Sequence, residues 1–423
     1  MKSATSKPPR RTRIAFYSPG IVGLGHLRRN LLLAQTLAES ELNSVNLLVT
    51  EAREASAFVN CMPPGMDCLT LPGLSRGLDG VCRPRYLDLS LKEVIRLRSR
   101  TIRAALKEFE PDLFLVDHLP RGAYRELDPA LKQLKATGRT RLVLGLRDVL
   151  GEPWAVHRDW FRWRFDDALD EYYDSVWVYG DPTLYNLVEQ YRFPSSIAAK
   201  VQFLGYLDQR KRLGFAQTQK LILDHSRALP DGPFVLCLLG GGQDGERLAE
   251  AFSMAEFPPG QTGILVTGPF MPLETERRLL QRAAQNPQLR ILNFVTEPTA
   301  LVEKAERIIA MGGYNTICEV LSFQKRALIV PRSKPRQEQI IRAECLHRLG
   351  FIDSLDVEQL TPQALTVWMA RVLPPLRVDG RLDLGGLERL PTIAASVLGK
   401  TLAQPKAQPM AAGLGAPVTV STS

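Results

Sequence analysis

The sequence predicts an α/β protein of two doubly wound domains, each a parallel sheet with helices on both faces, that face each other across a cleft. A chain of 423 residues is too long for one core, because single cores stop growing near ~250–300 residues. Short apolar runs alternate with helical stretches, which is the pattern of parallel sheets. The alternation restarts after the polar stretch 208–211, so we expect domains at 13–212 and 213–400.

The expected strands read as continuous apolar runs, as they do when both faces of a sheet are covered. In the first domain they are 13–17, 45–50, 113–117, 141–146 and 175–179, with a helix at about 27–40. In the second they are 234–239, 264–267, 289–292, 307–310 and 327–331, with a helix at 316–323. Ligands on such sheets bind outside the carboxyl ends of the strands, so the cleft is the expected site.

The two ends of the chain are expected to be disordered tails. Residues 1–12 are polar and basic and lack the apolar segment of a signal peptide. Residues 404–423 are rich in Ala, Pro, Gly, Ser and Thr, a composition that does not form a packed core.

The composition restricts the location and the partners. Hydrophobic residues make up 45% of the chain, yet no apolar run approaches the ~20 residues of a membrane span. Six scattered cysteines without zinc-ligand spacing favour reduced thiols in the cytoplasm. The net charge of +9 favours anionic partners such as a nucleotide or an acidic lipid surface. Nucleic acid is not an expected partner, because the sequence carries no motif for it.

The most basic segment, 81–107, admits two interpretations. Its cations interleave with apolar residues at roughly helical spacing, and they are Arg83, Arg85, Lys92, Arg96, Arg98, Arg100, Arg103 and Lys107. The first interpretation is a helix with a solvated outer face that covers a sheet. The second is a basic amphipathic helix that holds the protein peripherally on the inner face of the membrane.

A pair of glycines at a strand-to-helix junction is the most informative local feature. At Gly312 and Gly313, backbone N–H groups can approach an anion closely, and the helix N-terminus adds partial positive charge. Asn315 and Thr316 begin that helix, and Glu319 follows near its first turn. Phosphate at the glycines and a ribose diol at the carboxylate would make a nucleotide site. The alternative is an ordinary tight βα turn.

A second glycine-rich turn follows the first strand of the second domain. Gly240, Gly241 and Gly242 precede Gln243 and a predicted helix, which makes another anion cradle. If the strands before the two turns are neighbours, both turns point at the same diphosphate.

His26 is the candidate base of the first domain. It follows Gly25 at the entrance to the first helix, and Arg28 stands where a dinucleotide-binding fingerprint would need a glycine. A neutral imidazole facing the cleft would take a proton from an attacking hydroxyl. The alternative is that His26 caps the helix or bonds the backbone.

Two more strand ends of the first domain carry polar pairs. Asp117 and His118 end one strand, and Arg147 and Asp148 end another. These four residues are the candidates for the acceptor side of the cleft. A buried core aspartate or a helix cap is the alternative for each pair.

The loop after the last strand named above is basic and rich in amides. Arg336 offers charge to a phosphate, and Gln337 offers donors and acceptors to sugar hydroxyls. The alternative is a capped surface helix.

Taken in order, these segments resemble glycosyltransferase family 28, typified by the bacterial peptidoglycan-precursor N-acetylglucosaminyltransferases. The matching residues span roughly 13–349 and are Gly23-Leu24-Gly25-His26, Gly240-Gly241-Gly242-Gln243, Phe294, Gly313 to Glu319, and Arg336-Gln337. The resemblance implies a GT-B fold, two Rossmann-like domains with the donor bound mainly to the C-terminal one. It also implies catalysis without a bound metal or cofactor, and the sequence has no Asp-x-Asp that would hold one.

The resemblance assigns roles to the donor side. Glu319 would bond the ribose hydroxyls, and Phe294 would flank a uracil. Gly242 and Gln243 would lie by the diphosphate, and Gln337, with Glu338 as a second candidate, would contact the donor sugar. The full donor set expected is Gly25, Gly241, Gly242, Gln243, Phe294, Gly313, Asn315, Thr316, Glu319, Arg336 and Gln337.

Departures from the family pattern leave the sugar and the acceptor open. The family places two glycines directly before its histidine, whereas this chain has Gly-Leu-Gly before His26. The resemblance implies that His26 lies near the reacting centre. Arg28 and Arg29 replace a stretch that usually carries a proline, and Glu338 stands where a second glutamine is frequent.

The expected function is transfer of a hexose or N-acetylhexosamine from a UDP-sugar to a hydroxyl acceptor, for which a lipid-linked molecule is one candidate. Two alternatives remain open. One is a non-hydrolysing UDP-sugar 2-epimerase of the same architecture, with Asp117 or Asp148 as acid or base. The other is a catalytically silent nucleotide-sugar-binding protein.

Overall fold

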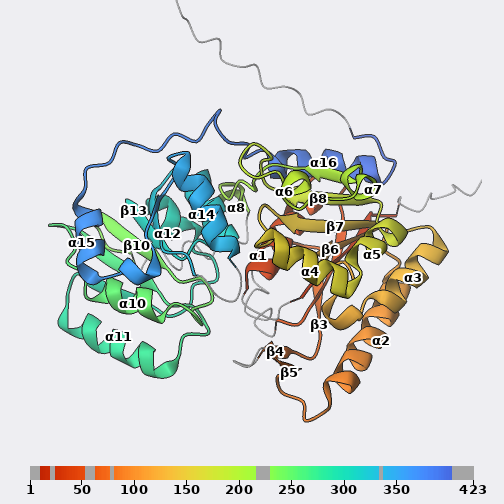
Figure 1. The fold of residues 1–423 in the computed structure, drawn as a ribbon, viewed down its shortest axis with the longest axis horizontal. Helices are drawn as coiled ribbons and strands as arrows, with labels where there is room; N and C mark the ends of the chain where they lie inside the picture. The colour runs from red at the N-terminus through yellow and green to blue at the C-terminus, as the bar shows by residue number, and fades with distance from the viewer. Residues whose placement is uncertain are drawn as a thin grey trace, which may run out of the picture.

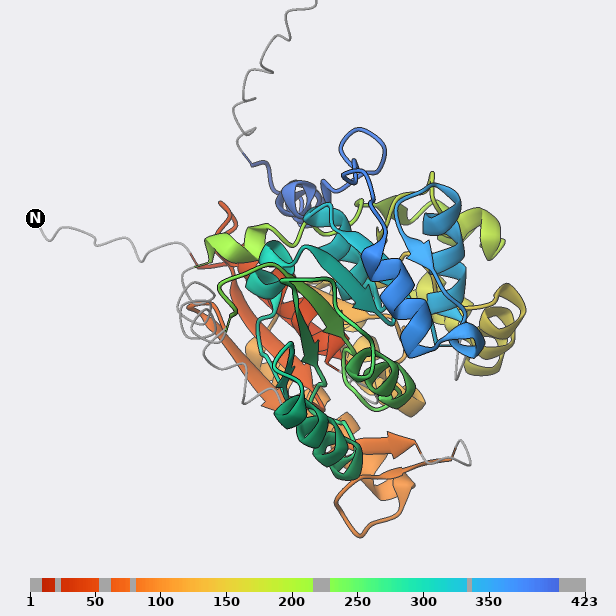
Figure 2. The ribbon, with the colours of Figure 1, turned by 90° about the vertical axis from the view of Figure 1, so that its left-hand side faces the viewer.

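The computed structural model describes residues 10–19, 24–52, 62–76, 81–215, 229–332 and 337–402. Two α/β domains lie side by side, each built on a parallel sheet (Figure 1). Figure 2, turned by 90°, places the C-terminal domain in front of the N-terminal one. The predicted architecture of two doubly wound domains is confirmed.

The N-terminal sheet has the strand order β3-β2-β1-β6-β7-β8-β9 within the described ranges, with all neighbours parallel. These strands are β1 (Arg13–Ser18), β2 (Val45–Thr50), β3 (Met66–Thr70), β6 (Leu113–Asp117), β7 (Arg141–Arg147), β8 (Ser175–Tyr179) and β9 (Val201–Phe203). A separate antiparallel hairpin pairs β4 (Leu74–Arg76) with β5 (Cys82–Pro84). The helices are α1 (Gly25–Ala38), α2 (Leu91–Phe109), α3 (Asp128–Thr137), α4 (Pro153–Trp163), α5 (Phe165–Tyr172), α6 (Leu187–Gln190), α7 (Ser195–Ala198) and α8 (Lys211–Gly214), with a 3₁₀ turn η2 (Ala123–Arg125).

The C-terminal sheet has the order β12-β11-β10-β13-β14-β15 in the part of the chain described, again parallel throughout. Its strands are β10 (Phe234–Leu238), β11 (Thr262–Val266), β12 (Leu289–Leu292), β13 (Arg307–Ala310), β14 (Arg326–Ile329) and β15 (Asp353–Ser354). The helices are α10 (Glu246–Ser253), α11 (Leu273–Gln285), α12 (Thr299–Lys304), α13 (Tyr314–Ser322), α14 (Glu338–Arg348), α15 (Pro362–Ala370) and α16 (Gly386–Val397), with a 3₁₀ turn η3 (Val357–Gln359).

Burial explains which strands could be predicted from the sequence. β6, β8 and β10 are buried at every residue, as parallel strands covered on both faces must be. The predicted strands are all found, with their ends shifted by at most a residue or two. The edge strands β3, β9 and β15 were not predicted, because they are short, half-exposed and mixed in polarity.

The chain returns to the N-terminal domain at its end. α16 packs against α1, on the far side of the molecule from α15 (Figure 1). The Tyr206 N–H donates to the Asp383 carbonyl at 2.8 Å, and Arg389 Nε donates to the Leu204 carbonyl at 3.1 Å. The expected boundary 213–400 is therefore corrected, since α16 belongs in space to the N-terminal domain.

α2 covers the N-terminal domain with one side and meets solvent with the other. Ser90 and Glu93 form a capping box at its start, and its buried residues are Val94, Arg98, Ile102 and Leu106. Arg98, counted above among the cations of the basic segment, is wholly buried and pairs with Glu51 and Glu126. The remaining exposed cations of the helix still form a basic outer face.

A buried ion pair joins the two domains. Asp148, just after β7, accepts hydrogen bonds from the Arg342 guanidinium of α14 at 2.7, 2.8 and 3.1 Å. Tyr206 donates to the same carboxylate at 2.7 Å, and Arg342 also donates to the Gly312 carbonyl at 3.2 Å. Both charged side chains are almost completely inaccessible. The pair therefore fixes the end of β7 against the turn that follows β13.

Breaking this pair should destabilise the protein strongly. We expect Asp148→Asn to lower the free energy of unfolding by about 3–5 kcal/mol, because it leaves the buried Arg342 charge uncompensated. Urea denaturation measures the loss. The matched control is Arg247→Gln, which removes an exposed ion pair to Glu358 and should change stability little. Equal losses in the two variants would show that the buried pair does not hold the domains together.

Candidate active site

The two sheets each have a switch in strand order beside the cleft. β1 lies between β2 and β6, and β10 lies between β11 and β13. Such switch points open a crevice at the carboxyl ends of the strands. The crevices meet in one cavity of about 1370 Å³, part of which is open to solvent. Its lining includes Gly25, His26, Arg28, Arg29 and Arg147 from the N-terminal domain and Gly241, Gly242, Gln243, Phe294, Gly313, Asn315, Thr316, Glu319, Glu338 and Gln339 from the C-terminal domain.

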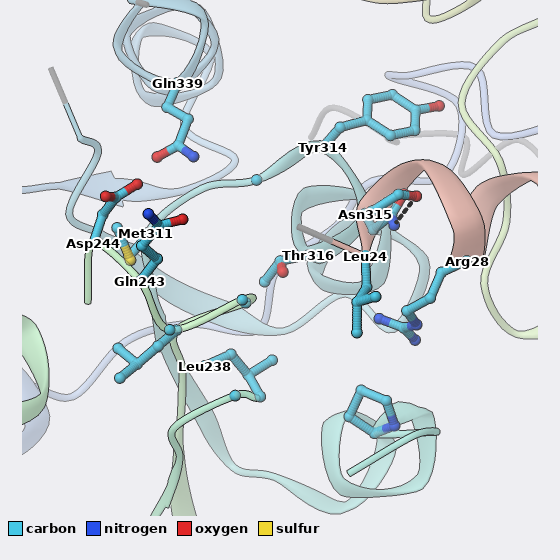
Figure 3. A pocket seen from close by; sticks show the side chains of 18 of the residues that line it. Leu24, Arg28, Leu238, Gln243, Asp244, Met311, Tyr314, Asn315, Thr316 and Gln339 are labelled. Atoms are coloured by element: carbon cyan, nitrogen blue, oxygen red, sulfur yellow. Dashed lines mark hydrogen bonds between the residues drawn. The ribbon is translucent and has the colours of Figure 1, made fainter. Parts of the chain in front are cut away.

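The turn after β10 needs its glycines. Gly242 has φ 87°, and a Cβ there would lie 2.2 Å from the Thr267 carbonyl oxygen, so no other residue fits without moving the backbone. The backbone of the turn therefore packs directly on the end of β11 while Gly241 and Gln243 face the cavity. Figure 3 shows Gln243 and Asp244 on the side of the cavity opposite Leu24 and Arg28.

The turn after β13 is the second anion cradle. Gly312 has φ 82°, and Gly313 begins α13 without a side-chain cap. The first N–H groups of a helix lack intrahelical partners, so they are available to an anion beside Gly313. β10 and β13 are paired neighbours, which confirms the predicted adjacency of the two turns.

Glu319 lies in the cavity wall, and only one of its two carboxylate oxygens has a hydrogen-bond partner among the described residues. Its Oε1 accepts a hydrogen bond from Arg28 Nη2 of the other domain at 2.9 Å. Its Oε2 is buried and has no hydrogen-bond partner among the described residues. Burial raises the pKa of Glu319, against the opposing effect of Arg28. One carboxylate oxygen is thus available to a ligand hydroxyl while the other holds the N-terminal domain.

Asn315 also spans the cleft. Its Nδ2 donates to the Gly25 carbonyl at the start of α1, at 2.9 Å (Figure 3). Thr316, the next residue of α13, lines the cavity. The start of α13 therefore both faces the cavity and touches the helix that carries His26.

His26 is oriented by Asp117. Its Nδ1 lies 2.8 Å from Asp117 Oδ2, and Arg29 Nη2 donates to both carboxylate oxygens at 2.5 and 2.7 Å. Burial opposes the charge on Asp117, but Arg29 and His26 outweigh it, so its pKa lies well below the usual range. Arg29 Nη2 also lies 2.9 Å from Nδ1, but its protons are directed to the Asp117 oxygens at shorter distances. With the ionised carboxylate as its acceptor, Nδ1 is assigned as the donor, and Nε2 is the nitrogen left to accept a proton.

His118 stacks on His26, with ring centroids 4.5 Å apart and planes 15° from parallel. Its backbone has φ 50°, a strained conformation for a residue other than glycine. Ligand atoms of His26, Asp117 and His118 lie within 4.8 Å of one another, a spacing that a metal ion can bridge. Lone pairs of stacked rings run in separate planes and do not converge on one ion, and Arg29 already neutralises Asp117. This arrangement suits proton handling better than cation binding.

The two predicted sugar contacts differ in their position relative to the cavity. Gln337 precedes α14 as its cap residue and is not among the cavity-lining side chains, whereas Glu338 and Gln339 are. Arg336 lies outside the described residues. Gln339 Oε1 also accepts the Arg332 backbone N–H at 3.1 Å. The sequence could not locate the helix start closely enough to distinguish these positions.

The two acceptor-side pairs separate in the structure. Arg147 lines the cavity, whereas Asp148 points into the domain interface and is held by Arg342. Asp117 stands behind His26 rather than in the lining. Arg29 and Arg342, which line the cavity, were missed because nothing in a single sequence pairs them with their aspartates.

Residues 235–374 match the glycosyltransferase family 28 C-terminal domain. This match covers about a third of the chain and most of the C-terminal sheet. Both glycine turns, Phe294 and Glu319 lie within the matched residues.

Two curated proteins share sequence with parts of the chain. The UDP-N-acetylglucosamine--N-acetylmuramyl-(pentapeptide) pyrophosphoryl-undecaprenol N-acetylglucosamine transferase of Streptococcus gordonii is 35% identical over 75 residues, 17% of this chain and 21% of that protein. An uncharacterized glycosyltransferase of Methanosarcina acetivorans is 29% identical over 161 residues, 35% of this chain and 41% of that protein. The chain thus spans about a fifth and two fifths of the lengths of these relatives.

Solved structures share the architecture over most of the chain. CalG4, the calicheamicin glycosyltransferase, has a TM-score of 0.56 at 17% identity, over 93% of this chain and all of that one. MurG of Acinetobacter baumannii has a TM-score of 0.51 at 17% identity, over 85% and 90% of the two chains. A UDP-GlcNAc 2-epimerase of Neisseria meningitidis has a TM-score of 0.56 at 13% identity, over 92% and 100%. The chain has the GT-B fold, and at these identities the likeness concerns the fold alone.

The environment of His26 gives a prediction that needs no substrate. Burial lowers the pKa of His26 below the usual 6.5, although Asp117 acts in the opposite direction. We expect NMR titration of the ring nitrogens to find neutral His26 at pH 7, with Nδ1 protonated. Asp117→Asn should lower that pKa further, since it removes the charge that stabilises imidazolium. A His26 pKa above 6.5 would contradict the dominant effect of burial, and a pKa that rises in Asp117→Asn would contradict the pairing with Asp117.

Proposed function

We propose that this protein is a glycosyltransferase that moves a sugar, a hexose or N-acetylhexosamine, from a UDP-sugar to a hydroxyl acceptor. One observation carries the proposal. The two glycine turns and Glu319 of the C-terminal domain share a single cavity with the His26–Asp117 pair of the other domain.

The C-terminal wall suits a nucleotide diphosphate. The N–H groups at Gly241 and at the start of α13 would bind the diphosphate, and the buried Oε2 of Glu319 would accept a ribose hydroxyl. Phe294 would flank the base. Gln243, Glu338 and Gln339 are the polar side chains placed to contact phosphate or the donor sugar.

The N-terminal wall suits deprotonation of an acceptor. Neutral His26, held by Asp117, would remove the acceptor proton through Nε2 as the hydroxyl attacks the anomeric carbon. The bond to the departing diphosphate breaks in the same step, and the helix N-terminus would stabilise the charge that develops on it. In this proposal the reaction uses no metal ion.

The relatives support this choice of donor. The Streptococcus gordonii protein is named as an enzyme that transfers N-acetylglucosamine from its UDP derivative to a pyrophosphoryl-undecaprenol acceptor. We propose the same class of donor, a nucleotide sugar, for this chain. A lipid-linked molecule is the first class of acceptor to test.

An epimerase of the same fold is the second candidate, favoured by the fold likeness to the Neisseria meningitidis enzyme. That chemistry needs acid and base groups around the sugar ring. Asp117 is held by His26 and Arg29, and Asp148 is held by Arg342, so neither faces the cavity. The geometry therefore favours the transferase. Interconversion of a UDP-sugar without an acceptor would reverse this ranking.

We also propose that the protein is cytoplasmic and touches the inner face of the membrane through the β5–α2 region. Tyr86, Leu87 and Leu89 are exposed apolar residues just before α2, and the exposed Arg96 and Arg100 follow on its outer face. The described helices include none with the length and apolar character to cross a bilayer. Exposed apolar and basic groups side by side suit binding to anionic headgroups.

The roles of His26 and Glu319 should separate kinetically. We expect His26→Ala to lower kcat by about 10²–10⁴-fold while sparing the KM for the UDP-sugar, since it removes only the base. Glu319→Gln should instead raise that KM by about tenfold, because a charged hydrogen bond to the ribose is weakened. UDP release, followed over a panel of acceptors, measures both.

The control is His157→Ala, an exposed histidine of α4, which should keep wild-type kinetics. Wild-type turnover in His26→Ala would remove His26 from the mechanism. UDP binding without turnover across the whole acceptor panel would instead favour a silent binding protein.

The membrane contact should depend on charge at one place. We expect sedimentation with anionic vesicles at low salt to carry down the wild-type chain, and Arg96→Gln/Arg100→Gln to bind about 30-fold more weakly. Lys132→Gln/Lys135→Gln, which removes the same charge from α3, should bind as wild type. Equal weakening in both pairs would mean that net charge alone, and not the β5–α2 region, drives binding.

A further inference from the structure

Three arginines converge on the cavity wall near His26, and two of them are neutralised. Arg29 is held by Asp117, and Arg342 is held by Asp148 through two guanidinium nitrogens. Arg147 lines the same cavity, and the described residues give its guanidinium neither a hydrogen bond nor an ion pair. Its Nε is buried without a partner.

The charge on Arg147 persists at neutral pH. Burial, together with repulsion from Arg29 and Arg342, lowers the pKa of Arg147 to about 10, which still leaves it protonated at neutral pH. Glu338 attracts it through space but does not reach it. Arg147 is half-buried, and its buried Nε has no partner. A partly buried cation without a partner costs stability, so a protein keeps one there only for a purpose that folding does not supply.

We propose that Arg147 forms the binding site for an anionic group, a carboxylate or phosphate of a substrate, at the sugar end of the cavity beside His26. The proposal rests on the proposed transferase function and names the charge of its substrate. A planar guanidinium binds either oxyanion through two parallel hydrogen bonds. Because Arg147 and His26 both belong to the N-terminal domain, the acceptor is the source that the geometry favours. The other source of the same chemistry is a donor sugar that carries a carboxylate.

Glu338 defines where that anion lies. Its Oε2 is buried without a partner among the described residues, and Arg332 approaches its Oε1 at 3.4 Å from the C-terminal side. A carboxylate at this point repels a second anion and accepts neutral hydroxyls. The cavity is therefore positive at Arg147 and negative at Glu338, so a ligand with an anionic end and a hydroxyl-bearing ring has one favoured orientation.

The first experiment tests the anion site on the full-length chain without requiring turnover. Calorimetry with inorganic phosphate, in the presence of saturating UDP, should show binding to the wild type. Arg147→Met should bind phosphate about 10–100-fold more weakly. The phosphate affinity of Arg147→Lys should lie between those of the wild type and Arg147→Met, because lysine keeps the charge but cannot form two parallel hydrogen bonds. The control Arg247→Met removes an exposed arginine that does not line the cavity and should leave phosphate affinity unchanged.

A second readout excludes a structural role. Arg147→Met should melt at the wild-type temperature or above it, since it removes a half-buried charge that has no ion-pair partner among the described residues. A lower melting temperature, or wild-type phosphate affinity in Arg147→Met, would overturn the proposal.

The source of the anion is read from the donors. If the acceptor carries the charge, the affinities of UDP-glucose and UDP-glucuronate should fall by the same small factor in Arg147→Met. A selective loss of about tenfold or more for UDP-glucuronate would place the charge on the donor sugar and still support the anion site. If UDP binds to none of the variants nor to the wild type, the proposed function fails. Phosphate binding that depends on Arg147 would then still establish the anion site.

Discussion

The buried ion pair between Asp148 and Arg342 is the contact on which the geometry of the cleft depends. It joins the end of β7 to α14, and the same guanidinium bonds the carbonyl of Gly312 in the second anion cradle. Arg28 reaches Glu319 across the cavity and adds a second tie. The two sheets are therefore held with their switch points facing each other, and neither half of the site is complete without the other.

Charge compensation organises the cavity that results. Arg29 neutralises Asp117, and the ionised carboxylate then sets the tautomer of His26. Two groups in the cavity wall lack such compensation, and we interpret them as ligand positions. They are Oε2 of Glu319 on the donor side and the guanidinium of Arg147 on the acceptor side. Folding alone would have selected partners for both groups, because buried polar atoms without partners cost free energy. A nucleotide diphosphate sugar with a hydroxyl acceptor supplies partners of the right chemistry.

Sequence patterns predicted the fold and the donor side because both rest on local signals. Apolar runs mark parallel strands, and glycines such as Gly242 mark turns that no other residue can make. Long-range pairings left no local signal, so Asp117 was placed on the acceptor side and not behind His26, 91 residues away. The sugar-side amide was placed at Gln337 because the start of α14 was not known to within two residues. α16 was assigned to the wrong domain, since an apolar helix face does not say which sheet it covers.

Nucleotide binding to the wild-type chain is the decisive measurement, because every proposed role of the C-terminal domain depends on a nucleotide donor bound there. Unfolding should be measured with a panel of nucleoside diphosphates and nucleotide sugars. We expect UDP and UDP-sugars to raise the free energy of unfolding by about 2.7 kcal/mol at ~100 times their dissociation constant, with purine diphosphates well behind. A chain whose stability no nucleoside diphosphate or nucleotide sugar changes would contradict the account.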